Sequence, residues 1–156
     1  MKSRSASCLV TAIFAFSVLL AAAAHAVQYL ELTARQKERA FSPAVITEGG
    51  KTVWLAGHAG LEDASGKSLA GDFDAQVRAA FAAINRTLQR AGGSLDNMVT
   101  MTVFIADVRY GDRFVQIRRE MFPQDNFPAS ALITVSGFAR PGMLIEIQGV
   151  AVIGGK

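Results

Sequence analysis

The chain has 156 residues and a formal net charge of +3 at pH 7, from 16 Lys and Arg residues against 13 Asp and Glu residues. This length allows one domain with its own hydrophobic core and excludes two. The positive charge does not indicate nucleic-acid binding, because the basic residues form no cluster larger than pairs such as Arg118-Arg119.

Residues 1–26 have the features of a secretory signal peptide. Lys2 and Arg4 form a positive start, an apolar run extends from Leu9 to Ala24, and small residues flank His25 at the expected cleavage site. The apolar run is shorter than the roughly 20 residues of a membrane-spanning helix, and no positive flank follows it. We therefore expect a signal peptide over 1–26, a mature domain over 27–156, a periplasmic or secreted location and no stable membrane association.

Removal of the signal peptide would change the net charge of the chain and the residue types available for a functional site. The mature chain would hold fourteen Lys and Arg residues against thirteen Asp and Glu residues, a net charge of +1 that does not attract nucleic acid. Cys8 and His25 would also be lost, which leaves His58 as the one remaining histidine. The mature chain then has no thiol nucleophile, no disulfide and no Cys/His zinc site, and we expect neither a metal nor a cofactor.

The first part of the mature chain predicts short strands. Residues Val27 to Ser42 show no clear period and predict an edge strand followed by a loop. Two short β-type runs follow, at 44–48 and 52–57. The paired glycines Gly49-Gly50 between them predict a hairpin turn, because glycine adopts positive φ without strain.

A long helix is predicted next, from apolar residues that recur every three or four positions. These residues are Phe73, Val77, Ala80, Phe81, Ile84 and Leu88. Asp72 or Asp74 can cap the start of this helix, and Gly92-Gly93 can end it. The same pattern places Gln76 largely on the solvent side.

The remaining elements are a strand at 98–106, a helix at 111–122 and strands at 129–136 and 143–153. One face of the last strand mixes polar and apolar residues: Leu144, Glu146, Gln148, Val150 and Val152. Two helices can cover only one face of a sheet. The other face is too apolar for water, so we expect it to form a subunit interface.

Five segments in order resemble one known family. They are Val53 to Gly57, Ala91 to Asn97, Thr102 to Asp107, Phe127 to Ala129 and Leu144 to Ile147. Together they resemble the Rid family, also called YjgF, whose older labels include endoribonuclease L-PSP. The resemblance implies a chorismate-mutase-like α+β fold, with a mixed sheet and two helices on one face. It also implies a homotrimer with clefts between subunits, in which characterised members hydrolyse enamines and imines to ketoacids and ammonia without metal or cofactor.

The resemblance also implies site residues. In the family, a glutamate on the last strand positions the attacking water, and Glu146 matches it as the catalytic residue. An arginine that follows the Pro-Ala pair holds the substrate carboxylate, and Ser130 stands at this position. We expect the ligand-binding positions to be Ser130, Gly57, His58, Ala129, Phe41 and Val115. His58 is more simply interpreted as a turn residue with local hydrogen bonds, although near the cleft.

Three functions follow as hypotheses. The first is a cofactor-free imine or enamine hydrolase centred on Glu146, and the second is a non-catalytic protein that binds a small molecule. The third, a ribonuclease or translation inhibitor, is opposed by the mature charge and by export. Because the Ser130 hydroxyl offers one neutral hydrogen bond where a guanidinium would offer two charged ones, the sequence predicts little acceleration of 2-aminoacrylate hydrolysis. Arg140 could supply the missing charge, but an exposed loop arginine is the simpler interpretation.

Overall fold

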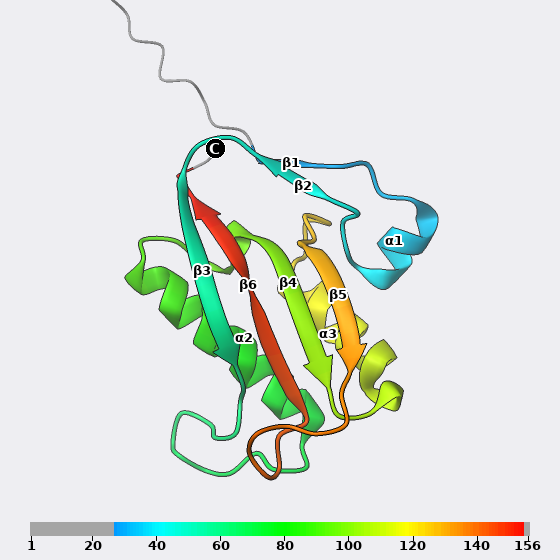
Figure 1. Cartoon of the computed structure of the whole chain (residues 1–156), viewed down its shortest axis with the longest axis vertical. Coiled ribbons are helices and arrows are strands. Elements are labelled where there is room, and N and C mark those ends of the chain that lie inside the picture. The colour runs from blue at the N-terminus through cyan, green and yellow to red at the C-terminus, as the bar shows by residue number, and fades with distance from the viewer. Residues whose placement is uncertain (1–26, 155–156) are drawn as a thin grey trace, which may run out of the picture.

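The computed structural model describes residues 27–154, so the predicted signal peptide lies outside the described residues. The chain forms two sheets and three α-helices within this range (Figure 1). The elements in order are β1 (Val27–Tyr29), α1 (Ala34–Arg39), β2 (Val45–Thr47), β3 (Lys51–His58), α2 (Phe73–Arg90), η1 (Leu95–Asn97), β4 (Met98–Ile105), η2 (Val108–Tyr110), α3 (Gly111–Met121), β5 (Ala129–Thr134) and β6 (Ile145–Ile153).

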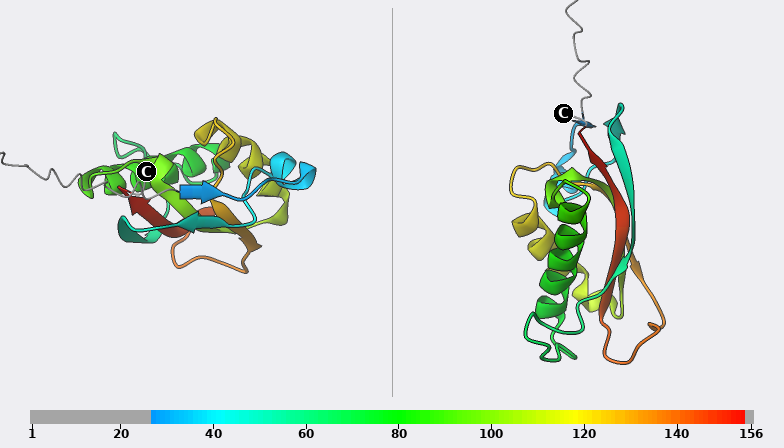
Figure 2. Two further views of the ribbon diagram at one scale, coloured as in Figure 1. Left: turned by 90° about the horizontal axis from the view of Figure 1, so that it is seen from above. Right: turned by 90° about the vertical axis from the view of Figure 1, so that its left-hand side faces the viewer.

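The main sheet has four strands in the order β3-β6-β4-β5. The β3–β6 and β6–β4 pairs are antiparallel, whereas β4 and β5 are parallel and joined by a crossover through α3. Helices α2 and α3 pack against one face of this sheet and leave the other face without a helix (Figure 2). The predicted α+β architecture, a mixed sheet with two helices on one face, is confirmed.

Helix α2 forms where the sequence pattern places it. All six apolar residues of its predicted stripe are buried, and the Asp72 side chain caps the helix by accepting a hydrogen bond from Ala75 N at 3.0 Å. The core between the helices and the sheet is centred on Phe81, whose ring packs against those of Phe114 and Phe122. Burial of such rings is the main favourable contribution to the stability of this layer.

The prediction for residues 27–42 is wrong in part, because a helix, α1, forms where a loop was expected. Thr33 and Gln36 make a capping box, with Gln36 Oε1 accepting from Thr33 N at 2.8 Å. Ala40 ends the helix in the left-handed conformation, at φ 52°. The helix has only six residues and none of them is buried, so no apolar period marks it in the sequence.

The Gly49-Gly50 turn also differs from the prediction. Both glycines have positive φ, 63° and 76°. However, β2 pairs with β1, and β3 pairs with β6, so the turn joins strands of different sheets and no hairpin forms. The chain therefore swings from the small β1–β2 ribbon into the edge of the main sheet (Figure 1).

The face of the sheet without helices carries apolar side chains in contact with solvent. Trp54 of β3 is 81% exposed and Ile133 of β5 is 42% exposed. Trp54 pairs across the sheet with half-buried Val150 of β6, which in turn pairs with Thr100 of β4. We call this surface the open face. Of the residues expected on it from the sequence, Val152 is already buried within one chain and Leu144 packs against the core. The apolar part of the open face therefore consists of Val150 together with Trp54 and Ile133.

Gly149 of β6 lies so close to the backbone of β4 that its substitution tests the strand register of the main sheet. A methyl group on Gly149 would overlap the backbone oxygen of Thr100 and lie 3.2 Å from Met101 Cα, and these backbone atoms are fixed by the ladder. We expect Gly149→Ala to lower the free energy of unfolding by about 3 kcal/mol in urea denaturation. Gly137→Ala is the matched control, because nothing lies within 4 Å of its added methyl group. Equal midpoints for the two variants would contradict the register.

Candidate functional site

Glu146 lies on the open face of the sheet. Its neighbours along β6, Ile145 and Ile147, are fully buried toward the helices, so the glutamate side chain points to the opposite face. There its carboxylate lies against the backbone of Gly57: a Cβ added at Gly57 would overlap Glu146 Oε1 and lie 2.8 Å from Cδ. The structure thus brings together two of the predicted site residues, and glycine is required for their contact.

An irregularity in β3 exposes Gly57 at this point. Leu55 pairs with Gly149 and His58 pairs with Ile147, so β3 uses one more residue than β6 over the same distance. Such a bulge redirects side chains on either side of it. Gly57 is therefore exposed beside Glu146, while His58 turns back toward the helices.

His58 makes two hydrogen bonds. Its Nδ1 donates to Ala56 O at 2.8 Å, within β3, and its Nε2 lies 3.1 Å from Thr87 Oγ1 on α2. His58 is the last residue of β3 and not a turn residue, and only one of its two hydrogen bonds is local. The bond to α2 holds the end of β3 beside Gly57 against the helix layer.

Ser130 lies on the other side of the sheet, against a buried arginine. It is in register with buried Met101 of β4, and its Oγ accepts a hydrogen bond from Arg118 Nη1 at 2.5 Å. Arg118 of α3 is only 2% exposed, its Nη2 donates to Arg39 O at 2.6 Å, and its guanidinium lies 5.1 Å from the ring centroid of Phe114. Burial, followed by the positive charges of Arg39 and Arg119, lowers the pKa of Arg118 to about 10.

Arg118 is a residue that the sequence analysis missed. It follows Phe114 by one helical turn, and therefore occupies a position on the apolar stripe of α3 where a hydrophobic residue is expected. A charge at a core position is the signal that could have singled it out.

Three other predicted ligand-binding positions remain. Ala129 and Phe41 lie at or near the start of β5, and Val115 lies in the core. Ala129 is half-buried and forms a parallel bridge with Ser42, whose backbone N donates to Pro128 O at 3.3 Å. Phe41 precedes Ser42 and is half-buried. Val115 is 6% exposed and belongs to the hydrophobic core.

The predicted site residues fall into two groups within one chain. Glu146 pairs with Phe104 of β4 on the open face, whereas Ser130 pairs with Met101 on the helix-facing side. Met101 and Phe104 are three positions apart on β4, roughly 10 Å along the strand, and their side chains lie on opposite faces of the sheet. A site that uses both Glu146 and Ser130 therefore needs two chains.

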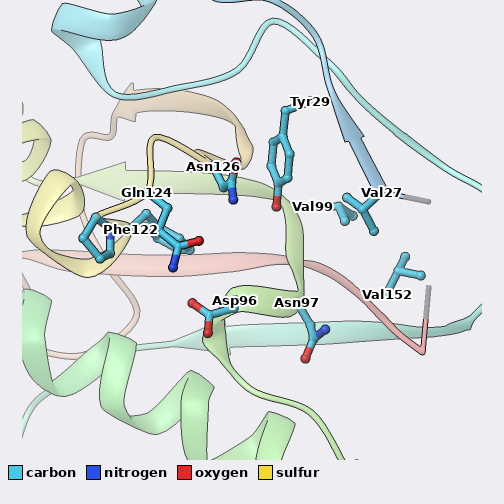
Figure 3. A pocket seen from close by; sticks show the side chains of 10 residues that line it. Val27, Tyr29, Asp96, Asn97, Val99, Phe122, Gln124, Asn126 and Val152 are labelled. Atoms are coloured by element: carbon cyan, nitrogen blue, oxygen red, sulfur yellow. The ribbon is translucent and has the colours of Figure 1, made fainter. Parts of the chain in front are cut away.

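A separate pocket of about 640 Å³ opens at one end of the sheet (Figure 3). Its residues come from β1, η1, β4, β6 and the segment after α3: Val27, Tyr29, Asp96, Asn97, Val99, Phe122, Pro123, Gln124, Asn126 and Val152. Only Tyr29 and Asp96 of these ionise, and burial, followed by the charge of Asp96, raises the pKa of Tyr29. None of the predicted site residues lines this pocket.

Gln76 of α2 holds the segment that leads to Glu146. The sequence pattern places Gln76 on the solvent side, and this is wrong, because the residue is fully buried. Its Nε2 donates to Leu69 O at 2.9 Å and Gly142 O at 2.8 Å, and its Oε1 accepts from Leu144 N at 2.9 Å. Because its amide satisfies three backbone groups, burial is compatible with its polarity.

Two negative findings concern residues 27–154 alone. In this range no three His, Cys, Asp or Glu side chains are grouped so that they could hold a metal ion. Nor does any helix of the described range have the length and apolar character to cross a membrane.

Comparison with known proteins gives consistent matches over most of the chain. Residues 32–153 match the family model described as Endoribonuclease L-PSP. The chain is 30% identical over 114 residues to the 2-iminobutanoate/2-iminopropanoate deaminases of Homo sapiens and Bos taurus, which covers 73% of this chain and 80% of each relative.

Solved structures share the fold. The Rid-family protein YyfB of Yersinia pestis, itself of unknown function, superposes with a TM-score of 0.72 at 22% identity, over 83% of this chain and 99% of that one. A member of the YjgF/YER057c/UK114 family from Mycobacterium tuberculosis gives a TM-score of 0.58 at 23% identity, over 82% and 100% of the two chains. The predicted fold is thereby confirmed, and the chain belongs to the Rid (YjgF, endoribonuclease L-PSP) family.

Proposed function

We propose that this protein is a cofactor-free deaminase that hydrolyses a small imine or enamine in a cleft between the chains of a homotrimer. The observation that carries the proposal is the placement of Glu146, whose carboxylate lies on the open face against the Gly57 backbone. The relatives in Homo sapiens and Bos taurus are named as 2-iminobutanoate/2-iminopropanoate deaminases, which supports this reaction class.

The reaction needs one base beside a bound water. Glu146 accepts a proton from water as the water oxygen attacks the C=N carbon, and passes this proton to the nitrogen, which completes an amino alcohol with a new C–O bond. Glu146 then accepts the hydroxyl proton of the amino alcohol and passes it to the amino nitrogen, the C–N bond breaks, and the products are a ketone and ammonia. An imine and one water give these two products without any redox step, so the reaction requires no cofactor.

The homotrimer is supported by the open face and by the division of the site. The open face exposes Trp54 and Ile133, which is unfavourable in water and favourable in a subunit interface. Contact between the open face of one chain and the β5 edge of a second chain would bring Glu146 toward Ser130.

The test of the reaction is ammonia release from 2-iminobutanoate generated in solution, measured against its spontaneous hydrolysis. Ser130 alone predicts little acceleration, but the structure places the Arg118 guanidinium 2.5 Å from its hydroxyl, so we expect the purified protein to accelerate release of ammonia and 2-ketobutyrate. If ammonia appears at the spontaneous rate with this substrate and with 2-iminopropanoate, the deaminase proposal fails for both, and a non-catalytic small-molecule binder becomes the better hypothesis. Ser130, at the position where the family resemblance implies an arginine, is the observation that favours this alternative.

Export is a separate part of the proposal, supported by the layout of residues 1–26. When the full chain is expressed in its own cell, N-terminal sequencing should find a mature protein that begins at or next to Val27 in the periplasmic or secreted fraction. An intact Met1 on a cytoplasmic protein would rule export out.

A further inference from the structure

Arg118 is a buried cation without a negative partner. It is 2% exposed, and its two hydrogen-bond acceptors, Ser130 Oγ and Arg39 O, are both neutral. Its Nε is buried without any hydrogen-bond partner, and no carboxylate of the described residues forms a salt bridge with it. A desolvated charge is costly unless it is paired, so an anion is the partner that this site lacks.

The contact of Arg118 with α1 does not by itself require a buried charge. Arg119, the next residue, also holds the end of α1: its Nη2 donates to the carbonyls of Lys37 and Glu38 at 2.6 and 2.8 Å. Arg119 does so from an exposed position, where its charge remains hydrated. Burial of Arg118 is therefore not required in order to hold α1 against α3.

Ser130 connects the buried charge to the edge of the sheet. Its hydroxyl accepts from Arg118 Nη1, which leaves its own proton free to donate, and a hydroxyl polarised by a cation is a stronger donor. Ser130 is half-buried on β5, the outermost strand of the main sheet on this side.

A second unpartnered polar group lies on the adjoining segment. Ser42 Oγ is buried without a hydrogen-bond partner, and Ser42 forms a bridge with Ala129, the neighbour of Ser130. The start of β5 therefore combines two unsatisfied polar atoms, Ser42 Oγ and Arg118 Nε, with a polarised hydroxyl and an uncompensated positive charge. The Arg39 side chain pairs with Asp112 at 2.5 Å, and Asp112 is exposed.

We propose that Arg118, acting through the Ser130 hydroxyl, supplies the positive charge that holds a small carboxylate at the start of β5. This inference rests on the proposed function and adds a charge-supplying residue, Arg118, to its site. The guanidinium that the family resemblance places at position 130 comes here from α3, one layer behind the strand. Arg118 is a positioning and charge-supplying residue, and Ser130 is the group that touches the ligand.

Binding of 2-ketobutyrate tests this inference independently of catalysis. Calorimetric titration of the oligomeric protein should show at least tenfold tighter binding of 2-ketobutyrate than of its neutral amide. Arg118→Gln should weaken binding of 2-ketobutyrate by about tenfold to a hundredfold, without an effect on the amide, and Arg118→Lys should retain part of the preference. Arg119→Gln is the matched control: it removes an equivalent contact with α1 and should leave both affinities unchanged.

Ser130→Asp is a second variant that tests the anion site if the Arg118→Gln protein does not fold. The new carboxylate would pair with Arg118, preserve the fold and repel an anionic ligand, so binding of 2-ketobutyrate should be lost. The inference is overturned if Ser130→Asp binds 2-ketobutyrate normally, if the wild-type protein binds the amide equally well, or if it binds neither compound. Selective binding of 2-ketobutyrate without ammonia release would instead refute the proposed reaction and leave the anion site in place.

Discussion

Replacement of Glu146 by glutamine should lower kcat for ammonia release by at least a hundredfold. The amide has the shape of the carboxylate and keeps the contact with Gly57, but it cannot accept a proton from water. Loss of a positioned general base typically costs about 10² to 10⁴ in rate. Binding of 2-ketobutyrate should change by no more than a few-fold, because the glutamine variant retains the volume of the site.

The control for this experiment is Glu120→Gln. Glu120 lies on the surface of α3, where it pairs with Arg78 at 2.5 Å and takes no part in the proposed site. We expect its substitution to leave ammonia release unchanged. If Glu146→Gln is as active as Glu120→Gln, then Glu146 is not the base, and the deaminase proposal fails at its central residue.

A charge at Trp54 should dissociate the protein into monomers and abolish its activity. Trp54 is 81% exposed in one chain and occupies the apolar part of the open face beside Val150. Trp54→Asp therefore costs little in the isolated fold, but it would bury an unpaired carboxylate in an assembled interface. We expect light scattering to show the monomer mass, and ammonia release to fall at least tenfold.

Val108→Asp is the matched control for the interface. Val108 is comparably exposed, at 74%, but lies on η2 outside the open face. This variant should retain three times the monomer mass and full activity. A wild-type protein that is monodisperse as a monomer at micromolar concentration would exclude the homotrimer, and with it the shared cleft.

The elements with strong apolar periods could be predicted from the sequence, and those held by polar contacts could not. Helix α2 is defined by six buried residues at helical spacing, which the sequence shows directly. Helix α1 has no buried residue and depends on a capping box and on carbonyl contacts with Arg118 and Arg119, which come from a segment about 80 residues away. Buried Gln76 was likewise misplaced, because its three partners lie in loops.

The candidate site also has a part that could be predicted from the sequence and a part that depends on contacts between distant elements. The family resemblance gives Glu146 and Gly57 as separate site residues, and the structure shows that they are in contact. The charge behind Ser130 could not be predicted, because Arg118 lies on a different element and its burial depends on how α3 packs against β5. The sequence alone suggested a site without a cation; the structure places one 2.5 Å from the serine hydroxyl.

We expect Glu146 and Ser130 to act together only across two chains. Co-expression of Glu146→Gln and Ser130→Asp chains tests it most directly, since each variant alone should be inactive. With random assembly about three quarters of the trimers are mixed, and one of the three clefts in each mixed trimer combines an intact Glu146 with an intact Ser130 from different chains, so about a quarter of the wild-type activity should return. Mixed trimers that form but remain as inactive as the separate variants would show that both residues act from one chain, which would contradict the shared site.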